Sequence, residues 1–272
     1  MVAIRAAQSA EPATPVIPVR TLSQRDLNLS LREGWNDFLS MRGDLIFVGL
    51  LYPLVGFVAA WLTLGYNFVP LFFPVASGIT LLGPIVAIGF YELARRREAG
   101  LESDWSHFFD VRKRPSADGL VTVAALLISI FMLWIVAAGG LYVALWGMNF
   151  PDSIGAFLSR LFTTPEGWTL IIVGNLVGAV FAVLVLAISV VSLPMLVDCD
   201  IEPGTAVRTS IRAFRANRGL MIRWGFTIAV LLVIGSIPIF IGLAVVLPWL
   251  GYATWHLYTH VVDRSALEIC SD

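Results

Sequence analysis

Residues 120–147 read LVTVAALLISIFMLWIVAAGGLYVALWG, an apolar run without a single Asp, Glu, Lys or Arg. A helix needs about 20 apolar residues to cross the hydrocarbon core of a bilayer, so this run is long enough to span a membrane. Residues 167–197 form a second run of the same kind. The whole chain is 58% hydrophobic and only 14% charged, whereas a soluble domain is about 25% charged. The sequence therefore predicts an all-α integral membrane protein.

Two further apolar blocks flank this central pair of spans. The block from Leu45 to Tyr91 is too long for one helix, and Gly65, Asn67 and Pro70 interrupt it. The last block is predicted to break around residues 235–238. We therefore predict six transmembrane helices in three hairpins, at about 45–64, 68–91, 120–147, 167–197, 221–239 and 241–262. They form a single membrane domain over residues 21–264, between a disordered cytoplasmic tail at 1–20 and a cytoplasmic tail at 265–272.

The basic residues are sorted to one side of these spans. Of the 18 Lys and Arg residues, only Arg160 falls in a loop on the opposite side. Short loops rich in Lys and Arg stay in the cytoplasm, so the count predicts that both termini are cytoplasmic. Cys199 and Cys270 lie on the same side. Disulfides are rare in that compartment, so we expect both thiols to be free.

A short amphipathic segment precedes each predicted hairpin. Each segment has a large apolar residue, then Phe three residues later and Arg seven residues later, which places all three on one helical face. The three sets are Trp35, Phe38 and Arg42; Trp105, Phe108 and Arg112; and Ile211, Phe214 and Arg218. We expect interfacial helices that end with Arg near the headgroups, and Ser23 with Asp26 is a candidate capping box. A threefold internal repeat is one interpretation; features common to any helix entering a membrane are the other.

The outer loop, residues 148–166, has a helical pattern of its own. Asp152 or Ser153 is placed to cap a helix, and Thr164 with Pro165 suits the start of the next one. Between them, one apolar face carries Ile154, Phe157, Leu158, Leu161 and Phe162. We expect this helix to act as a packed lid, and a gate is the alternative.

Candidate binding residues are few. Basic and aromatic side chains beside the spans are expected to contact lipid headgroups or a protein partner, and no nucleic-acid partner is expected. These residues are Arg95, Arg96, Arg97, Trp35, Trp105, Arg42, Arg112 and Arg218. Asn175 is the most polar residue well inside a span, between Gly174 and Gly178. This pattern favours close helix packing with one interhelical hydrogen bond over a substrate site.

His256 and His260 share a helical face near the end of the last predicted span. One interpretation is a haem or metal site. The other is an interfacial aromatic belt with Trp249, Tyr252, Trp255 and Tyr258. No third ligand has matching spacing, so no metal site is assigned, and no cofactor is expected beyond the haem alternative. No catalytic residues can be named either.

Several stretches resemble a known family when taken in order. They are residues 31–38 (LREGWNDF), 82–84 with 89–92 (LGP and GFYE), 164–167 (TPEG), 191–198 (VSLPMLVD) and 251–258 (GYATWHLY). The chain resembles, over about residues 18–264, an uncharacterised bacterial integral membrane family, domain of unknown function 2189. The resemblance implies a six-span inner-membrane protein and carries no established activity. We expect a non-enzymatic protein of the cell envelope that acts through bound lipid or protein partners. The alternatives are a permease for a small or amphipathic solute and a haem-binding redox subunit.

Overall fold

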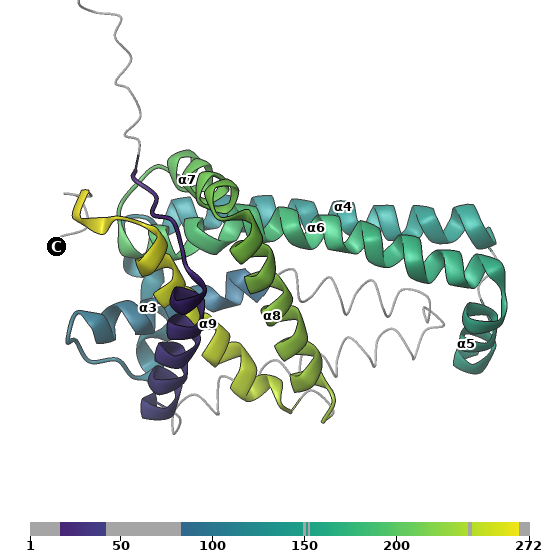
Figure 1. Ribbon diagram of the computed structural model, residues 1–272, viewed down its shortest axis with the longest axis horizontal. Helices are drawn as coiled ribbons and strands as arrows, with labels where there is room; N and C mark the ends of the chain where they lie inside the picture. The colour runs from purple at the N-terminus through teal and green to yellow at the C-terminus, as the bar shows by residue number, and fades with distance from the viewer. Residues whose placement is uncertain (1–16, 42–82, 149–150, 152, 239–240, 267–272) are drawn as a thin grey trace, which may run out of the picture.

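The computed structural model describes residues 17–41, 83–148, 151, 153–238 and 241–266 (Figure 1). Over these residues the fold is all-α, as predicted. The helices span residues 24–41, Gly83–Glu98 (α3), Trp105–Lys113 (η1, a 3-10 helix), Ala117–Trp146 (α4), Ile154–Thr163 (α5), Pro165–Asp198 (α6), Pro203–Ala216 (α7), Arg218–Ser236 (α8), Leu243–Val261 (α9) and Arg264–Ala266 (η2, a 3-10 helix). The predicted span 45–64 and most of the span 68–91 lie outside the described residues.

Three of these helices are long and apolar enough to cross a membrane. They are α4, α6 and α8, with mean hydropathies of 2.7, 2.8 and 1.8. They coincide with the predicted spans 120–147, 167–197 and 221–239. Helix α9 occupies the predicted sixth span but is not among the candidates in the described part of the chain. Its last turns carry Thr254, His256 and His260, which lower its hydropathy.

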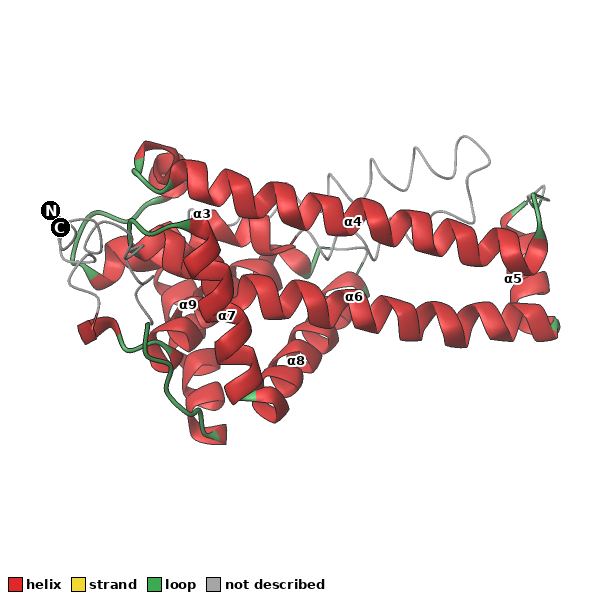
Figure 2. Ribbon diagram, turned by 90° about the horizontal axis from the view of Figure 1, so that it is seen from above, coloured by secondary structure: helices red, strands yellow, loops and turns green. Residues whose placement is uncertain are grey.

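The molecule has an arm and a lobe (Figures 1 and 2). In the arm, α4 and α6 run side by side, and α5 joins their far ends. The lobe contains helix 24–41, α3, η1, α7, α9 and the C-terminal part of α6. Every residue of α6 from Ile188 to Val197 is buried there. A single long helix therefore serves as an apolar span in the arm and as core in the lobe.

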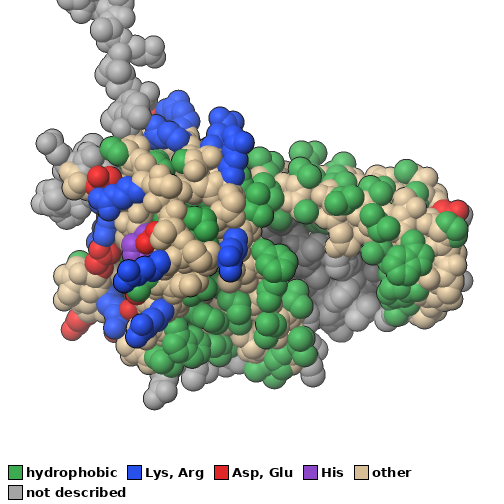
Figure 3. All heavy atoms as spheres, in the orientation of Figure 1, with side chains coloured by type: hydrophobic (Ala, Val, Ile, Leu, Met, Phe, Trp, Pro, Cys, Tyr) green, Lys and Arg blue, Asp and Glu red, His purple; other side chains and the backbone are tan. Residues whose placement is uncertain are grey.

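Charged and apolar side chains are divided between the lobe and the arm. In the view of Figure 3, Lys and Arg gather over the lobe, whereas the arm is mostly apolar. The arm's exposed side chains include Met132, Leu133, Val136 and Val180. This distribution matches the sorting of basic residues that was read from the sequence.

Helix 24–41 packs against α9 instead of lying free. A Cβ atom at Gly34 would overlap the backbone of Ala253, so only glycine permits this approach. The Trp249 indole N–H donates to the Leu31 carbonyl at 2.8 Å. The predicted capping box is confirmed, because the Ser23 N–H donates to Asp26 Oδ2 at 2.6 Å and the Asp26 N–H to Ser23 Oγ at 3.4 Å.

The other two amphipathic segments differ from the prediction. Segment 105–113 is a 3-10 helix, in which offsets of 0, 3 and 7 do not share a face. Its Phe108 is buried against Phe90, with ring centroids 5.0 Å apart, while Trp105 is exposed. The third segment, α7, ends at Ala216, so Arg218 opens α8 instead of closing the same helix. The predicted common face is therefore wrong for these two segments.

The outer loop folds as the sequence predicts. Helix α5 begins after Ser153, whose Oγ accepts from the Ala156 N–H at 3.1 Å. Thr164 caps α6 by accepting from the Gly167 N–H at 3.0 Å, and Pro165 is the first residue of that helix. The Arg160 guanidinium lies 4.5 Å from the ring centre of Trp146. Helix α5 joins the far ends of α4 and α6, but Leu158 and Phe162 of its apolar face are 44% and 55% exposed, so the packed lid and the gate both stay predictions.

Candidate functional site

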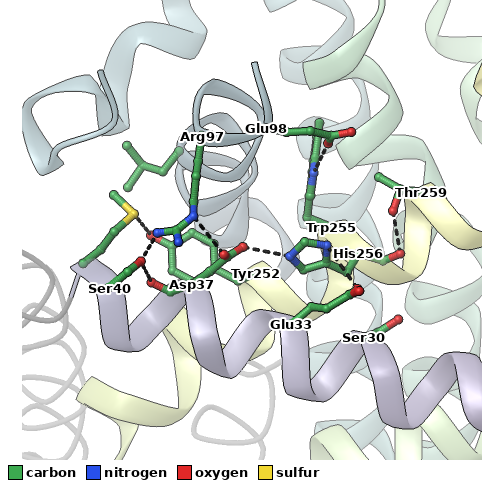
Figure 4. A network of polar contacts seen from close by, with 12 residues as sticks. Ser30, Glu33, Asp37, Ser40, Arg97, Glu98, Tyr252, Trp255, His256 and Thr259 are labelled. Carbon is green, nitrogen blue, oxygen red and sulfur yellow. Dashed lines mark hydrogen bonds and ion pairs between the residues drawn. The ribbon is translucent and has the colours of Figure 1, made fainter. Parts of the chain in front are cut away.

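Two helices bring the histidines and a pair of carboxylates together. Glu33 and Asp37 are four residues apart on helix 24–41, and His256 and His260 are four apart on α9, so each pair shares a face. We define the polar junction as Ser30, Glu33, Asp37, Arg97, His256 and His260, and Figure 4 labels the first five of these. His256 Nε2 lies 2.8 Å from Asp37 Oδ2, and His256 Nδ1 lies 3.5 Å from Glu33 Oε2.

His260 completes the junction from the next turn of α9. Its Nδ1 lies 3.1 Å from Ser30 Oγ, and its Nε2 lies 3.8 Å from Glu33 Oε2. Among the described residues, no group of three His, Cys, Asp or Glu is placed to hold a metal ion. The sequence placed the two imidazoles on one face correctly but missed their carboxylate partners. The four-residue spacing of Glu33 and Asp37 was the signal in the sequence that could have indicated these partners.

Arg97 ties a third helix into the junction. Its Nε lies 3.0 Å from Asp37 Oδ1, and an Nη1–H donates to Ser40 Oγ. The Asp37 side chain, only 13% exposed, is therefore shared by Arg97 of α3 and His256 of α9. One carboxylate holds three helices together.

The neighbouring arginines also have partners within the protein. Arg95 makes two bonds to the Glu92 carboxylate, at 2.7 and 2.9 Å, and this carboxylate is buried. Arg96 Nε donates to the Glu102 carbonyl at 2.6 Å. Desolvation lowers the pKa of Arg114, which donates to a backbone carbonyl at the end of α6. These guanidinium groups stabilise the lobe, so they are weaker candidates for lipid contacts than their charge alone suggested.

Acidic groups beyond the spans form ion pairs and hydrogen bonds within the lobe. Asp198 Oδ2 accepts from the Tyr258 hydroxyl at 2.7 Å and lies 3.5 Å from Arg264 Nη1. Arg264 also donates to Glu98, whose other oxygen accepts from the Trp255 indole N–H at 3.0 Å. The ends of α3, α6 and α9 are thereby joined.

The other predicted interface residues are spread over the lobe. Trp35 packs edge-on against Trp249, with ring centroids 5.0 Å apart, and both side chains pack against the buried core of the lobe. Arg112 lies 5.1 Å from the Phe109 ring centre. Arg218 is exposed at the start of α8, and Arg42 lies outside the described residues. The structure does not gather these residues into one site.

Asn175 does not make the predicted interhelical bond in the described structure. Its Nδ2 donates to the Ile171 carbonyl of its own helix at 2.7 Å, and the side chain is exposed. The glycines beside it do serve close packing. A Cβ at Gly178 would lie 3.3 Å from the Trp134 ring.

Cys199 also departs from the prediction. It follows the last residue of α6, is 1% exposed and is disulfide-bonded, which contradicts the expectation of a free thiol. The other cysteine of the chain, Cys270, lies outside the described residues.

An apolar cavity lies between α3, α6, α8 and α9. Its volume is about 450 Å³, and its described lining contains no charged side chain. Sequence reasoning missed it, because its walls come from small and apolar residues on four separate helices. The lining includes Pro84, Ala87, Tyr91, Val183, Leu186, Ser189, Ile222, Gly225, Phe226, Leu250 and Thr254.

The fold, the apolar arm and the cavity define an integral membrane protein with several helical spans. Residues 71–198 match the model of the family described as predicted integral membrane protein (DUF2189). This match confirms the predicted resemblance over just under half of the chain. No curated protein and no solved structure matches the chain.

Proposed function

We propose that the protein is a six-span component of a bacterial inner membrane that acts by binding a lipid chain in the cavity. Both termini would lie in the cytoplasm, and the role would be binding, not catalysis. The cavity carries this proposal. Its volume falls in the range of about 300–1,000 Å³ typical of small-molecule sites, and its walls are almost wholly apolar.

Exposed apolar residues at the rim of the cavity support the entry of a lipid chain from the bilayer. Ile222 and Phe226 of α8 are 52% and 69% exposed, and Val183 of α6 is 39% exposed. Both helices are candidate spans, so these side chains face hydrocarbon in a membrane. A lipid chain can then pass between them without crossing water, which keeps the cost of transfer small.

The basic residues of the lobe support the proposed orientation, with both termini in the cytoplasm. Exposed Arg218 and Arg112 are placed to meet anionic headgroups on the cytoplasmic side, where such lipids attract basic segments. We also propose that the lobe binds protein partners. The six spans would have arisen from a threefold repeat. A periplasm-dependent reporter fused after Ser236 tests the topology, because activity is expected there and inactivity would overturn the six-span arrangement.

Native mass spectrometry after purification in a mild detergent tests lipid binding. We expect the wild-type protein to carry a bound lipid mass. Ala87→Phe adds a ring inside the cavity and should abolish that mass, because Ala87 lines the wall. Ala125→Phe adds the same ring on the exposed face of α4 and should leave it unchanged. A lipid that survives Ala87→Phe would contradict the proposed site.

A permease is the second candidate, and a proline favours it. Pro248 lies inside α9 beside the lining residue Leu247. Proline removes a helical hydrogen bond and permits a kink, so α9 has a point at which it can bend. Flux of a fluorescent acyl solute into proteoliposomes, absent with Ala87→Phe, would favour transport over static binding.

A further inference from the structure

We infer that the ligand of the cavity is a long-chain lipid whose uncharged head donates a hydrogen bond, of the long-chain alcohol or monoacylglycerol class. This inference rests on the proposed lipid-binding function and deepens it. It follows from three hydroxyl groups that line the otherwise apolar cavity. They are those of Tyr91 on α3, Ser189 on α6 and Thr254 on α9, all buried.

Two of these hydroxyl groups already give their protons to backbone carbonyls. Ser189 Oγ donates to the Val185 carbonyl and Thr254 Oγ1 to the Leu250 carbonyl, both at 2.7 Å. The Tyr91 hydroxyl is hydrogen-bonded to the Thr254 side chain. The Thr254 oxygen keeps at least one lone pair for a further donor, whichever hydroxyl of this pair gives the proton.

The Ser189 and Thr254 hydroxyls therefore offer acceptors to a ligand. Each hydroxyl oxygen has two lone pairs, and the Ser189 oxygen receives no proton from the bonds just described. A ligand hydroxyl can supply that proton. Its alkyl chain would then lie along the apolar walls formed by residues such as Leu186 and Leu250.

A charged head fits this cavity poorly. Carboxylate and phosphate groups only accept hydrogen bonds when ionised, so they would meet the lone pairs of the Ser189 and Thr254 oxygens without a proton between them. No Lys or Arg is among the described lining residues to compensate the charge. Burying an unpaired anion is strongly unfavourable, so anionic lipids are expected to keep their heads outside.

Three matched probes test this inference on the full-length protein in detergent. Hexadecanol, its methyl ether and hexadecanoate share one chain and differ in the head, and native mass spectrometry titration gives their relative affinities. We expect hexadecanol to bind roughly threefold to tenfold more tightly than the ether, the value of one hydrogen bond. Hexadecanoate in alkaline buffer should bind more weakly than either.

Two variants separate recognition from general damage. Ser189→Ala and Thr254→Val each remove one acceptor, so the preference for alcohol over ether should fall towards one. Ser192→Ala is the matched control. Ser192 is also buried in α6 and donates to a carbonyl four residues earlier, that of Ile188, but it does not line the cavity. This control should keep the full preference.

The outcomes distinguish the inference from the proposed function. Equal binding of alcohol and ether, or an unchanged preference in both variants, would overturn the uncharged-donor inference while lipid binding stands. Tightest binding of hexadecanoate would overturn it as well. If none of the three probes binds and Ala87→Phe changes nothing, the proposed function itself fails.

Discussion

The hydroxyl of Ser210 on α7 accepts a hydrogen bond from the backbone N–H of Val191 on α6, at 3.2 Å. The same hydroxyl donates to the Ala187 carbonyl at 2.8 Å. In an undisturbed helix these two backbone groups bond to each other, so Ser210 is inserted into α6 one turn before Pro194. This insertion joins α7 to the buried part of α6.

Replacing Ser210 with Ala should therefore destabilise the lobe. The variant removes two hydrogen bonds between α7 and the buried part of α6, at a cost of about 1–3 kcal/mol. Thermal unfolding in detergent, followed by circular dichroism, measures the loss. Ser129→Ala removes an exposed hydroxyl that bonds its own helix and should change little. Equal stability of the two variants would contradict the insertion.

Asp37 should hold helix 24–41 in place. Asp37→Ala removes the partner of both Arg97 and His256, and we expect a loss of about 1–3 kcal/mol from unpaired groups. Hydrogen exchange should quicken in residues 24–41 and in the last turns of α9. The neighbouring variant Asn36→Ala, at an exposed position, is the control. Unchanged exchange in Asp37→Ala would show that apolar packing alone retains the helix.

The histidine pair is predicted to serve structure, because its ring nitrogens face Asp37, Glu33 and Ser30. His256→Ala with His260→Ala should lower stability as Asp37→Ala does. No visible absorbance band should disappear from the purified protein. A haem band that is present in the wild type and lost in this double variant would revive the redox alternative.

The capping box should make the start of helix 24–41 sensitive to acid. The Ser23 hydroxyl bond lowers the pKa of Asp26 below its ordinary value of 3.8. Because the pKa of the folded state is the lower one, this stabilisation is present above pH 3.8 and is lost as the pH falls below it. Ser23→Ala should cost about 1 kcal/mol at neutral pH. Unfolding followed between pH 3 and pH 7 should show that this cost shrinks towards the acid end; a constant difference would contradict the capping role.

The redox state of Cys199 tests the orientation of the lobe. With the lobe in the cytoplasm, the thiol should be reduced in cells and should form its disulfide only on air oxidation after purification. Maleimide labelling under denaturing conditions, with and without reductant, distinguishes the two states. A thiol that is blocked in freshly lysed cells until reductant is added would contradict the cytoplasmic assignment.

Local signals in the sequence predicted much of the fold correctly. The apolar runs predict α4, α6 and α8, because a helix that crosses hydrocarbon needs a length and an apolar composition that are visible in the local sequence. Ser23, Ser153, Thr164 and Pro165 mark helix starts because capping involves only residues within one turn. The expected common face of three amphipathic segments failed where local geometry differed, since segment 105–113 became a 3-10 helix.

By itself, the sequence determined an all-α membrane protein with charge sorted to one end, because these properties follow from composition and spacing along the chain. Only the tertiary structure decided that Asp37 meets His256 and Arg97, that Ser210 enters α6, and that Tyr91, Ser189 and Thr254 line one cavity. Each of these contacts joins residues far apart in the chain. They depend on which helices pack together, and interhelical packing leaves no periodic pattern in a single sequence.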